Sequence, residues 1–224
     1  MTVLAPNRNW SASGHAKTLG RPLRVDETQL ADGTPALTTD GAPSDCVALV
    51  LLGLTDPVDL VVTGINPHAN IGHDITYSGT VTSAMEAVIG GVPGLAFSLE
   101  TPRDLSDHDY APAAEIARRV AEKVIKEGLP KDVALSANIP YLPLDEIKGF
   151  RITRQGERIY RDELVYREDP FGRPYYWIGG EHPSGKLIAD TDFGAINAGY
   201  VSVTPLHLDM TARGEMARLK KWEW

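Results

Sequence analysis

A polar loop follows the apolar run at residues 60–62 and leads into a helical pattern near residue 78. Asn66 and Asn70 offer neutral side-chain oxygens and amides in this loop, and Ser78 and Thr80 offer hydroxyl groups where the helix begins. The amides and the dipole of a helix N-terminus attract anions, so this layout suits a phosphoryl group. The side-chain oxygens also suit a hard cation bound beside that group. An ordinary loop that caps a helix fits the same residues, and the spacing alone leaves both interpretations open.

Glycines and a second polar loop extend the set of candidate residues. Gly64, Gly72 and Gly79 would permit tight turns and a close approach of the backbone to a ligand. In the loop at residues 7–15, Ser11 could bind a ligand, cap a helix or have no role. We expect His15 to be a hydrogen-bonded loop histidine, because no second histidine or carboxylate stands at metal-ligand spacing.

Several motifs and partners are excluded. The chain contains no Gly-x-x-x-x-Gly-Lys-Ser/Thr motif of P-loop NTPases, no strand-anchored Gly-x-Gly-x-x-Gly motif and no Gly-x-Ser-x-Gly elbow. Its 22 Lys and Arg residues against 30 Asp and Glu residues give a net charge of −8. That balance argues against a nucleic-acid partner, since such proteins concentrate basic residues to neutralise phosphates.

The remaining composition indicates a cytoplasmic protein without a membrane partner. The single cysteine, Cys46, rules out an intrachain disulfide and fits a reducing compartment. Its apolar neighbours predict a buried residue instead of a reactive thiol. No apolar run approaches the roughly 20 residues of a membrane span, and the first residues lack the pattern of a signal peptide.

The elements that must position these residues alternate between strand and helix up to about residue 140. The unbroken apolar run at 60–62 is typical of a parallel strand covered on both faces. Ile116, Val120 and Val124 recur every fourth position and predict an amphipathic helix over 109–128. This alternation predicts an α/β fold with a doubly wound, mostly parallel sheet. The other expected elements are strands at 2–5, 94–99 and 133–135, a turn at 32–33, a helix over 43–53 buried through Val47, Leu49, Val50, Leu51 and Leu52, and a helix over 81–89 capped by Ser78 or Thr80.

From residue 150 the pattern changes to β-prone pieces at 150–153, 175–178 and 200–203, separated by turn residues. These pieces predict antiparallel arms, followed by a terminal helix over 210–224. Tyr175, Tyr176 and Trp177 form an aromatic patch that simple packing or burial in a partner subunit would explain. We therefore divide the chain into a core over 1–149 and an oligomerisation region over 150–224.

Motifs spread along the chain carry a family resemblance. The central loop reads Thr63-Gly64-Ile65-Asn66, then Asn70-Ile71-Gly72, then Tyr77-Ser78-Gly79-Thr80-Val81. Elsewhere the chain reads Ala5-Pro6-Asn7-Arg8-Asn9-Trp10-Ser11, Gly41-Ala42-Pro43-Ser44-Asp45-Cys46-Val47, Thr191-Asp192-Phe193 and Gly199-Tyr200-Val201-Ser202-Val203-Thr204-Pro205-Leu206. Together these motifs closely resemble the SurE family, the stationary-phase survival proteins that are metal-dependent 5′/3′-nucleotidases.

The resemblance implies a Rossmann-like fold with a C-terminal arm that exchanges between subunits, in a homodimer or homotetramer. It implies hydrolysis of a nucleoside monophosphate to nucleoside and phosphate, with Mn²⁺ or Mg²⁺ as the cofactor. Ser11 and Asn66 match the family's neutral metal ligands. Asn70 and the turn Ser78-Gly79-Thr80 match its phosphate-binding positions.

The chain departs from the family pattern at its beginning. The family's metal site also uses two adjacent aspartates in an Asn-Asp-Asp-Gly loop after the first strand, and this chain contains no Asp-Asp pair. Position 73 is His where an aspartate is common in the family. We expect the first strand and its loop to be missing, and we hypothesise that Met1 replaces an internal valine whose GTG codon was read as a start.

Two functions follow from the sequence. The first is a SurE-like nucleotidase that needs a divalent metal ion. The alternative is a catalytically inactive protein that binds phosphate weakly or only assembles. Activity that requires metal would distinguish them.

Overall fold

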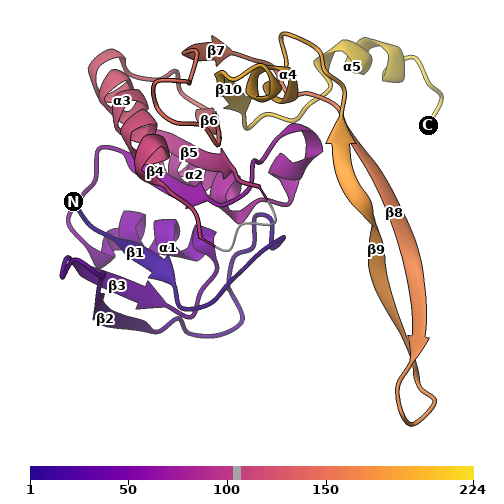
Figure 1. Ribbon diagram of the computed structural model, residues 1–224, viewed down its shortest axis with the longest axis horizontal. Helices are drawn as coiled ribbons and strands as arrows, with labels where there is room; N and C mark the ends of the chain where they lie inside the picture. Colours follow the sequence, from indigo (N-terminus) through magenta and orange to yellow (C-terminus); the bar gives the residue numbers. More distant parts are fainter. Residues whose placement is uncertain (103–106) are drawn as a thin grey trace.

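A five-stranded mixed sheet forms the centre of the computed structural model, which describes residues 1–102 and 107–224 (Figure 1). Its strand order is β4-β5-β6-β10-β7. β4, β5 and β6 run parallel, β10 is antiparallel to β6, and β7 is parallel to β10. The predicted α/β class is therefore confirmed, with an antiparallel addition at one edge. The strands are β4 (Val61–Asn66), β5 (Gly94–Glu100), β6 (Val133–Pro140), β7 (Phe150–Ile152) and β10 (Val201–His207).

A smaller sheet at the N-terminal side has the order β1-β3-β2. It consists of β1 (Leu4–Pro6), β2 (Val25–Gln29) and β3 (Pro35–Thr39). The turn predicted at Asp32 and Gly33 joins β2 to β3, and Gly33, at φ +84°, donates its N–H to the carbonyl of Leu30. Glycine suits this conformation because a Cβ is strained at positive φ. α1 (Pro43–Leu49) and a π-helical turn at Val50–Leu54 follow this sheet.

Two helices cover opposite faces of the central sheet. α2 (Gly79–Ile89) packs Val81, Ala84 and Met85 around Ala96 of β5. α3 (Ala111–Glu127) packs its predicted stripe of Ile116, Val120 and Val124 on the other face. Alternate residues of a strand point to opposite faces, so the side chains beside Ala96 face α3. These residues, Leu95 and Phe97, are fully buried and form the larger apolar core with Leu99, Ile139 and Val201.

Two burial predictions are wrong. The helix that begins at Pro43 passes into the π-helical turn, where the i→i+5 bonds change the direction of the side chains. Leu52 in this turn is 85% exposed. Val62 of β4 is 51% exposed, although a strand covered on both faces was expected. The physical reason for the second difference is that β4 is the outer strand of its sheet. Cys46 is buried as expected, and burial raises the pKa of its thiol to about 12.

A long hairpin of β8 (Arg158–Glu168) and β9 (Pro174–Gly185) projects from the body of the molecule (Figure 1). The aromatic patch of Tyr175, Tyr176 and Trp177 is exposed on it. β7 and β10 do not belong to this arm, because they pair within the central sheet. Two short helices complete the chain, α4 (Asp192–Asn197) and α5 (Arg213–Leu219). None of the helices among the described residues has the length and apolar character needed to cross a membrane.

Candidate functional site

An open cavity of about 520 Å³ lies at the carboxyl ends of β4 and β5, beside the start of α2. Ligands of open α/β sheets bind at this edge, because loops and helix N-termini converge there. All six residues singled out from the sequence line the cavity: Ser11, Asn66, Asn70, Ser78, Gly79 and Thr80. Chain segments from residue 11 to residue 80 therefore meet around one space.

The N-terminus of α2 faces this cavity with its positive end uncompensated. Ser78 is the N-cap, and its Oγ accepts the N–H of Val81 at 3.1 Å. The first turn carries no acidic side chain. Gly79 lies so close to Pro43 that a Cβ would come within 3.0 Å of the proline Cγ. The chain thus presents the first helical amides and the Thr80 hydroxyl to an anion.

Asn70 is held by a buried amide network. Its backbone N–H donates to Oδ1 of Asn138 at 2.7 Å, and Nδ2 of Asn138 donates to its carbonyl at 3.1 Å. Its own Nδ2 donates to Oγ of Ser98 at 2.7 Å. All three residues are buried, so these contacts determine how Asn70 meets the cavity.

A carboxylate behind the loop fixes Gly72. Asp192 is 2% exposed and its Oδ2 accepts the Gly72 N–H at 2.8 Å. Its Oδ1 accepts the N–H groups of Gly156 and Phe193. Gly72 has φ +54° and a Cβ there would approach the Gly156 carbonyl at 3.1 Å, so glycine is required.

The loop that carries Ser11 is tied to α2 through Glu86. Lys17 donates to one oxygen of Glu86 at 2.7 Å, and Nε2 of His15 lies 2.9 Å from the other. Burial opposes ionisation of Glu86, but the hydrogen bonds from Lys17 and His15 outweigh it and lower its pKa. The prediction that His15 is a hydrogen-bonded loop histidine is confirmed.

The described residues do not fit a divalent metal ion on their own. Oγ of Ser11 donates to Oδ1 of Asn9 at 2.7 Å, and Nδ2 of Asn66 donates to the His68 carbonyl at 2.5 Å. Both candidate ligands are neutral, whereas Mg²⁺ sites use one or two carboxylates with substrate phosphates. No group of three or more His, Cys, Asp or Glu that could hold a metal occurs in the described part of the chain.

Residues missed by the sequence reasoning also line the cavity. Asp74 accepts Nε of Arg158 at 2.9 Å and the Tyr160 hydroxyl at 2.6 Å. Burial first, and then this hydrogen bond to Asp74, raise the pKa of Tyr160. His73, by contrast, is exposed and does not line the cavity. Asp74 stands in the same loop as the predicted residues, but Arg158 is 84 residues further on and gave no local signal. The other missed lining residues include Asn9, Trp10, His68, Tyr77, Glu100 and Thr101.

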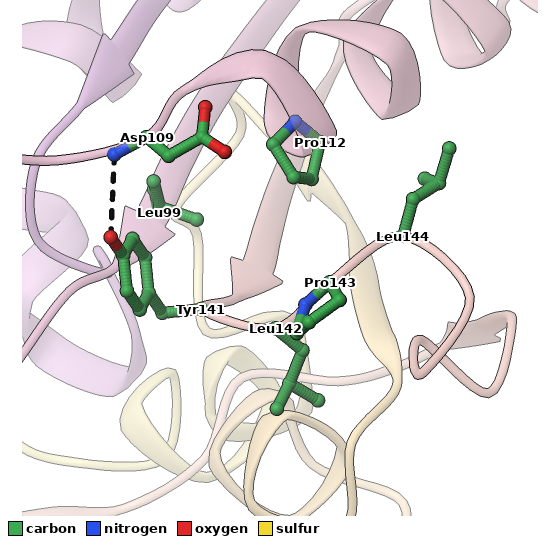
Figure 2. Close-up of a pocket in the computed structure, with 7 residues that line it drawn as sticks. All are labelled: Leu99, Asp109, Pro112, Tyr141, Leu142, Pro143 and Leu144. Carbon is green, nitrogen blue, oxygen red and sulfur yellow. Dashed lines mark hydrogen bonds between the residues drawn. The ribbon is translucent and has the colours of Figure 1, made fainter.

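A second hollow of about 350 Å³ lies between the end of β5 and the segment after β6 (Figure 2). Its lining is apolar apart from Asp109 and the hydroxyl of Tyr141, which accepts the Asp109 N–H at 3.3 Å. The start of α3 borders this hollow, but Pro112 has no N–H and the Ala111 N–H already donates to Oδ1 of Asp109. The larger cavity is therefore the better phosphate site.

Comparison with known proteins identifies the family. Residues 1–162 match the family described as "Survival protein SurE". The chain belongs to the SurE family. The 5′-nucleotidase SurE of Herpetosiphon aurantiacus is 51% identical over 225 residues, which cover 100% of this chain and 88% of that relative. The 5′-nucleotidase SurE of Geobacter sulfurreducens is 46% identical over 224 residues, which cover 100% of this chain and 83% of that relative.

A solved SurE structure confirms the fold. The crystal structure of the SurE protein from Aquifex aeolicus has a TM-score of 0.78 and 40% sequence identity, and covers 98% of this chain and 87% of that chain. The resemblance drawn from the motifs is therefore confirmed. This SurE-family chain departs from the expected motif pattern, since its 224 residues contain no adjacent aspartates and position 73 is His.

Proposed function

We propose that this SurE-family chain is a 5′-nucleotidase that hydrolyses nucleoside monophosphates to nucleoside and phosphate. Relatives at 44–51% identity over nearly the whole chain carry the name 5′-nucleotidase SurE. The observation that carries the proposal is that the N-terminus of α2, with Ser78, Gly79 and Thr80, and Asn70 line the same cavity. No comparison favours the alternative of an inactive protein.

The proposed roles follow from the chemistry of phosphoryl transfer. Such reactions are catalysed mainly by positioning the phosphoryl group and stabilising its charge. Ser78, Gly79 and Thr80 would bind the phosphate through helix amides and hydroxyl groups. Asn70 would contribute a side chain whose position is determined by Asn138 and Ser98.

Dependence on Mn²⁺ or Mg²⁺ is part of the proposal. Ser11 and Asn66 are the proposed neutral oxygen contacts for the ion. The described donors do not hold such an ion by themselves, so we assign no reaction step to it. If bound, such an ion would supply charge stabilisation for the phosphoryl group.

We further propose that the chain acts in the cytoplasm as a homodimer or homotetramer, without a nucleic-acid partner. The support for assembly is the β8–β9 arm, which exposes Tyr176, Trp177 and Ile178. In the proposed division, residues 1–149 form the nucleotidase core and residues 150–224 serve oligomerisation through the β8–β9 arm, while β7 and β10 of this region complete the central sheet.

The test is phosphate release from AMP by the 224-residue protein, with Mn²⁺, with Mg²⁺ and with EDTA. We expect release with at least one ion and loss of release with EDTA.

Thr80→Ala should lower kcat/KM by about tenfold, the effect of losing one hydrogen bond to a charged group. Thr76→Ala is the matched control, because its hydroxyl binds the His73 carbonyl outside the cavity lining. A folded protein that releases no phosphate under any of these conditions would contradict the proposal.

A further inference from the structure

Arg158 supplies the one Lys or Arg side chain among the described residues that line the cavity. It is the first residue of β8, where the arm leaves the body of the molecule. Its side chain is only 9% exposed. A guanidinium group buried to this extent is costly unless its donors are satisfied, so its contacts indicate what it binds.

One part of the guanidinium is used for anchoring. Nε donates to Oδ2 of Asp74 at 2.9 Å, and the other oxygen of Asp74 accepts the Tyr160 hydroxyl. Asp74 lies in the 3₁₀ turn Gly72–Thr76, whose C-cap Tyr77 directly precedes the α2 N-cap Ser78. The ion pair therefore connects Arg158 to the turn that leads into the proposed phosphate site.

The other part of the guanidinium has no hydrogen bond to the described side chains. The two terminal nitrogens of Arg158 make no hydrogen bond to residues 1–102, 107–181 and 183–224. Some polar side-chain atoms are fully buried and have no hydrogen-bond partner in that part of the chain, but the terminal nitrogens of Arg158 are not among them. Without a partner among these residues and not fully buried, these nitrogens are in contact with solvent. Arg158 lines the cavity, so an anion bound there would lie beside a side chain that still has two donors to offer.

We propose that the terminal nitrogens of Arg158 bind phosphate oxygens of the nucleotide. An arginine fork suits two oxygens of a phosphate, and the anchored Nε places it before the ligand arrives. Asp74 is a positioning residue, because its two oxygens hold Arg158 and Tyr160. The choice of a nucleotide as ligand rests on the proposed function, whereas the anion-binding role rests on the geometry of Arg158.

The test measures binding separately from turnover. Calorimetric titration in EDTA would compare inorganic phosphate, AMP and adenosine on the wild-type protein and on Arg158→Gln. We expect phosphate and AMP to bind at least about tenfold more weakly to Arg158→Gln, and adenosine to bind equally to both. Arg158→Lys keeps the charge but not the two parallel donors of the guanidinium, so its phosphate affinity should lie between those of the wild-type protein and Arg158→Gln. Arg161→Gln is the matched control, since this arginine of the same strand is exposed and pairs with Glu181.

A purely structural role for Arg158 predicts a different pattern. In that case Arg158→Gln and Asp74→Asn would lower the melting temperature together and leave phosphate affinity unchanged, which would overturn the proposal. We expect Asp74→Asn to weaken phosphate binding less than Arg158→Gln, because it keeps the guanidinium.

A second measurement needs no variant. Phosphate or AMP should slow phenylglyoxal modification of Arg158 in the wild-type protein, read by peptide mass spectrometry, and leave Arg161 unaffected. Equal modification of Arg158 with and without ligand would contradict the proposal. Wild-type protein that binds AMP through Arg158 but never hydrolyses it would overturn the proposed function alone. Hydrolysis with an unchanged KM in Arg158→Gln would overturn the role of Arg158 alone.

Discussion

At the scale of the residue, the amide of Asn138 substitutes for a peptide unit beside Asn70. It accepts from the backbone N–H and donates to the backbone carbonyl of Asn70, and both residues are buried. Asn138→Ala would leave these two groups unsatisfied, so we expect a loss of about 2 kcal/mol or more in the free energy of unfolding. We also expect a lower kcat/KM for AMP, measured by phosphate release, because Asn70 would shift.

The control for that variant lies two residues earlier in the same strand. Oγ of Ser136 is buried and makes no hydrogen bond in the described part of the chain. Ser136→Ala should therefore change neither stability nor kcat/KM appreciably. Similar losses in both variants, seen by urea unfolding, would show that β6 is merely intolerant of change.

The same scale governs metal binding. Ser11 and Asn66 are neutral, so we expect Mn²⁺ to bind the 224-residue chain no more tightly than about 1 mM when nucleotide is absent. Electron paramagnetic resonance of free Mn²⁺ measures this directly. Saturable binding in the micromolar range would show that other residues supply the charge.

At the scale of the element, Glu86 of α2 makes stability depend on pH. The pKa of Glu86 is lower in the folded state than in the unfolded state. The contribution of Glu86 to the free energy of unfolding is therefore fully present above the unfolded-state pKa, and it is lost as pH falls through the lower folded-state pKa. Glu86→Gln should cost about 1–3 kcal/mol at pH 7 and flatten the acid limb of a melting-temperature profile. Glu127→Gln is the control, because Glu127 is exposed and pairs only with Lys123 among the described residues. Parallel acid limbs for wild type and Glu86→Gln would contradict this assignment.

At the scale of the whole molecule, the exposed arm predicts assembly. Trp177 and Ile178 are 65% and 84% exposed, which is unfavourable for large apolar side chains at the middle of a hairpin. We expect the double variant Trp177→Glu, Ile178→Glu to reduce the molar mass measured by light scattering, and Leu52→Ser, an exposed apolar position on the body, to leave it unchanged. A wild-type protein that is monomeric at all concentrations would remove the arm as an assembly surface.

Local patterns were sufficient for much of the structure. The spacing of Ile116, Val120 and Val124 determined the buried stripe of α3, and the Asp-Gly pair determined the turn between β2 and β3. The sequence left the cap of α2 open between Ser78 and Thr80, and Ser78 is the N-cap. Capping and periodicity could be predicted because they depend on neighbours within one or two turns. The motifs identified the family, and the six candidate residues proved to line one cavity.

Long-range packing decided the rest. No local pattern indicates that β10 pairs antiparallel with β6, that β4 is an outer strand with Val62 exposed, or that Asn138 meets Asn70. The ion pair of Arg158 with Asp74 is likewise not indicated by a local pattern, since 84 residues separate them. The sequence by itself determined most elements of the core, the family and one set of polar candidates, but not β8 or α4. Only the tertiary structure decided which distant side chains complete the cavity, because contacts between strands and loops depend on how the whole chain packs.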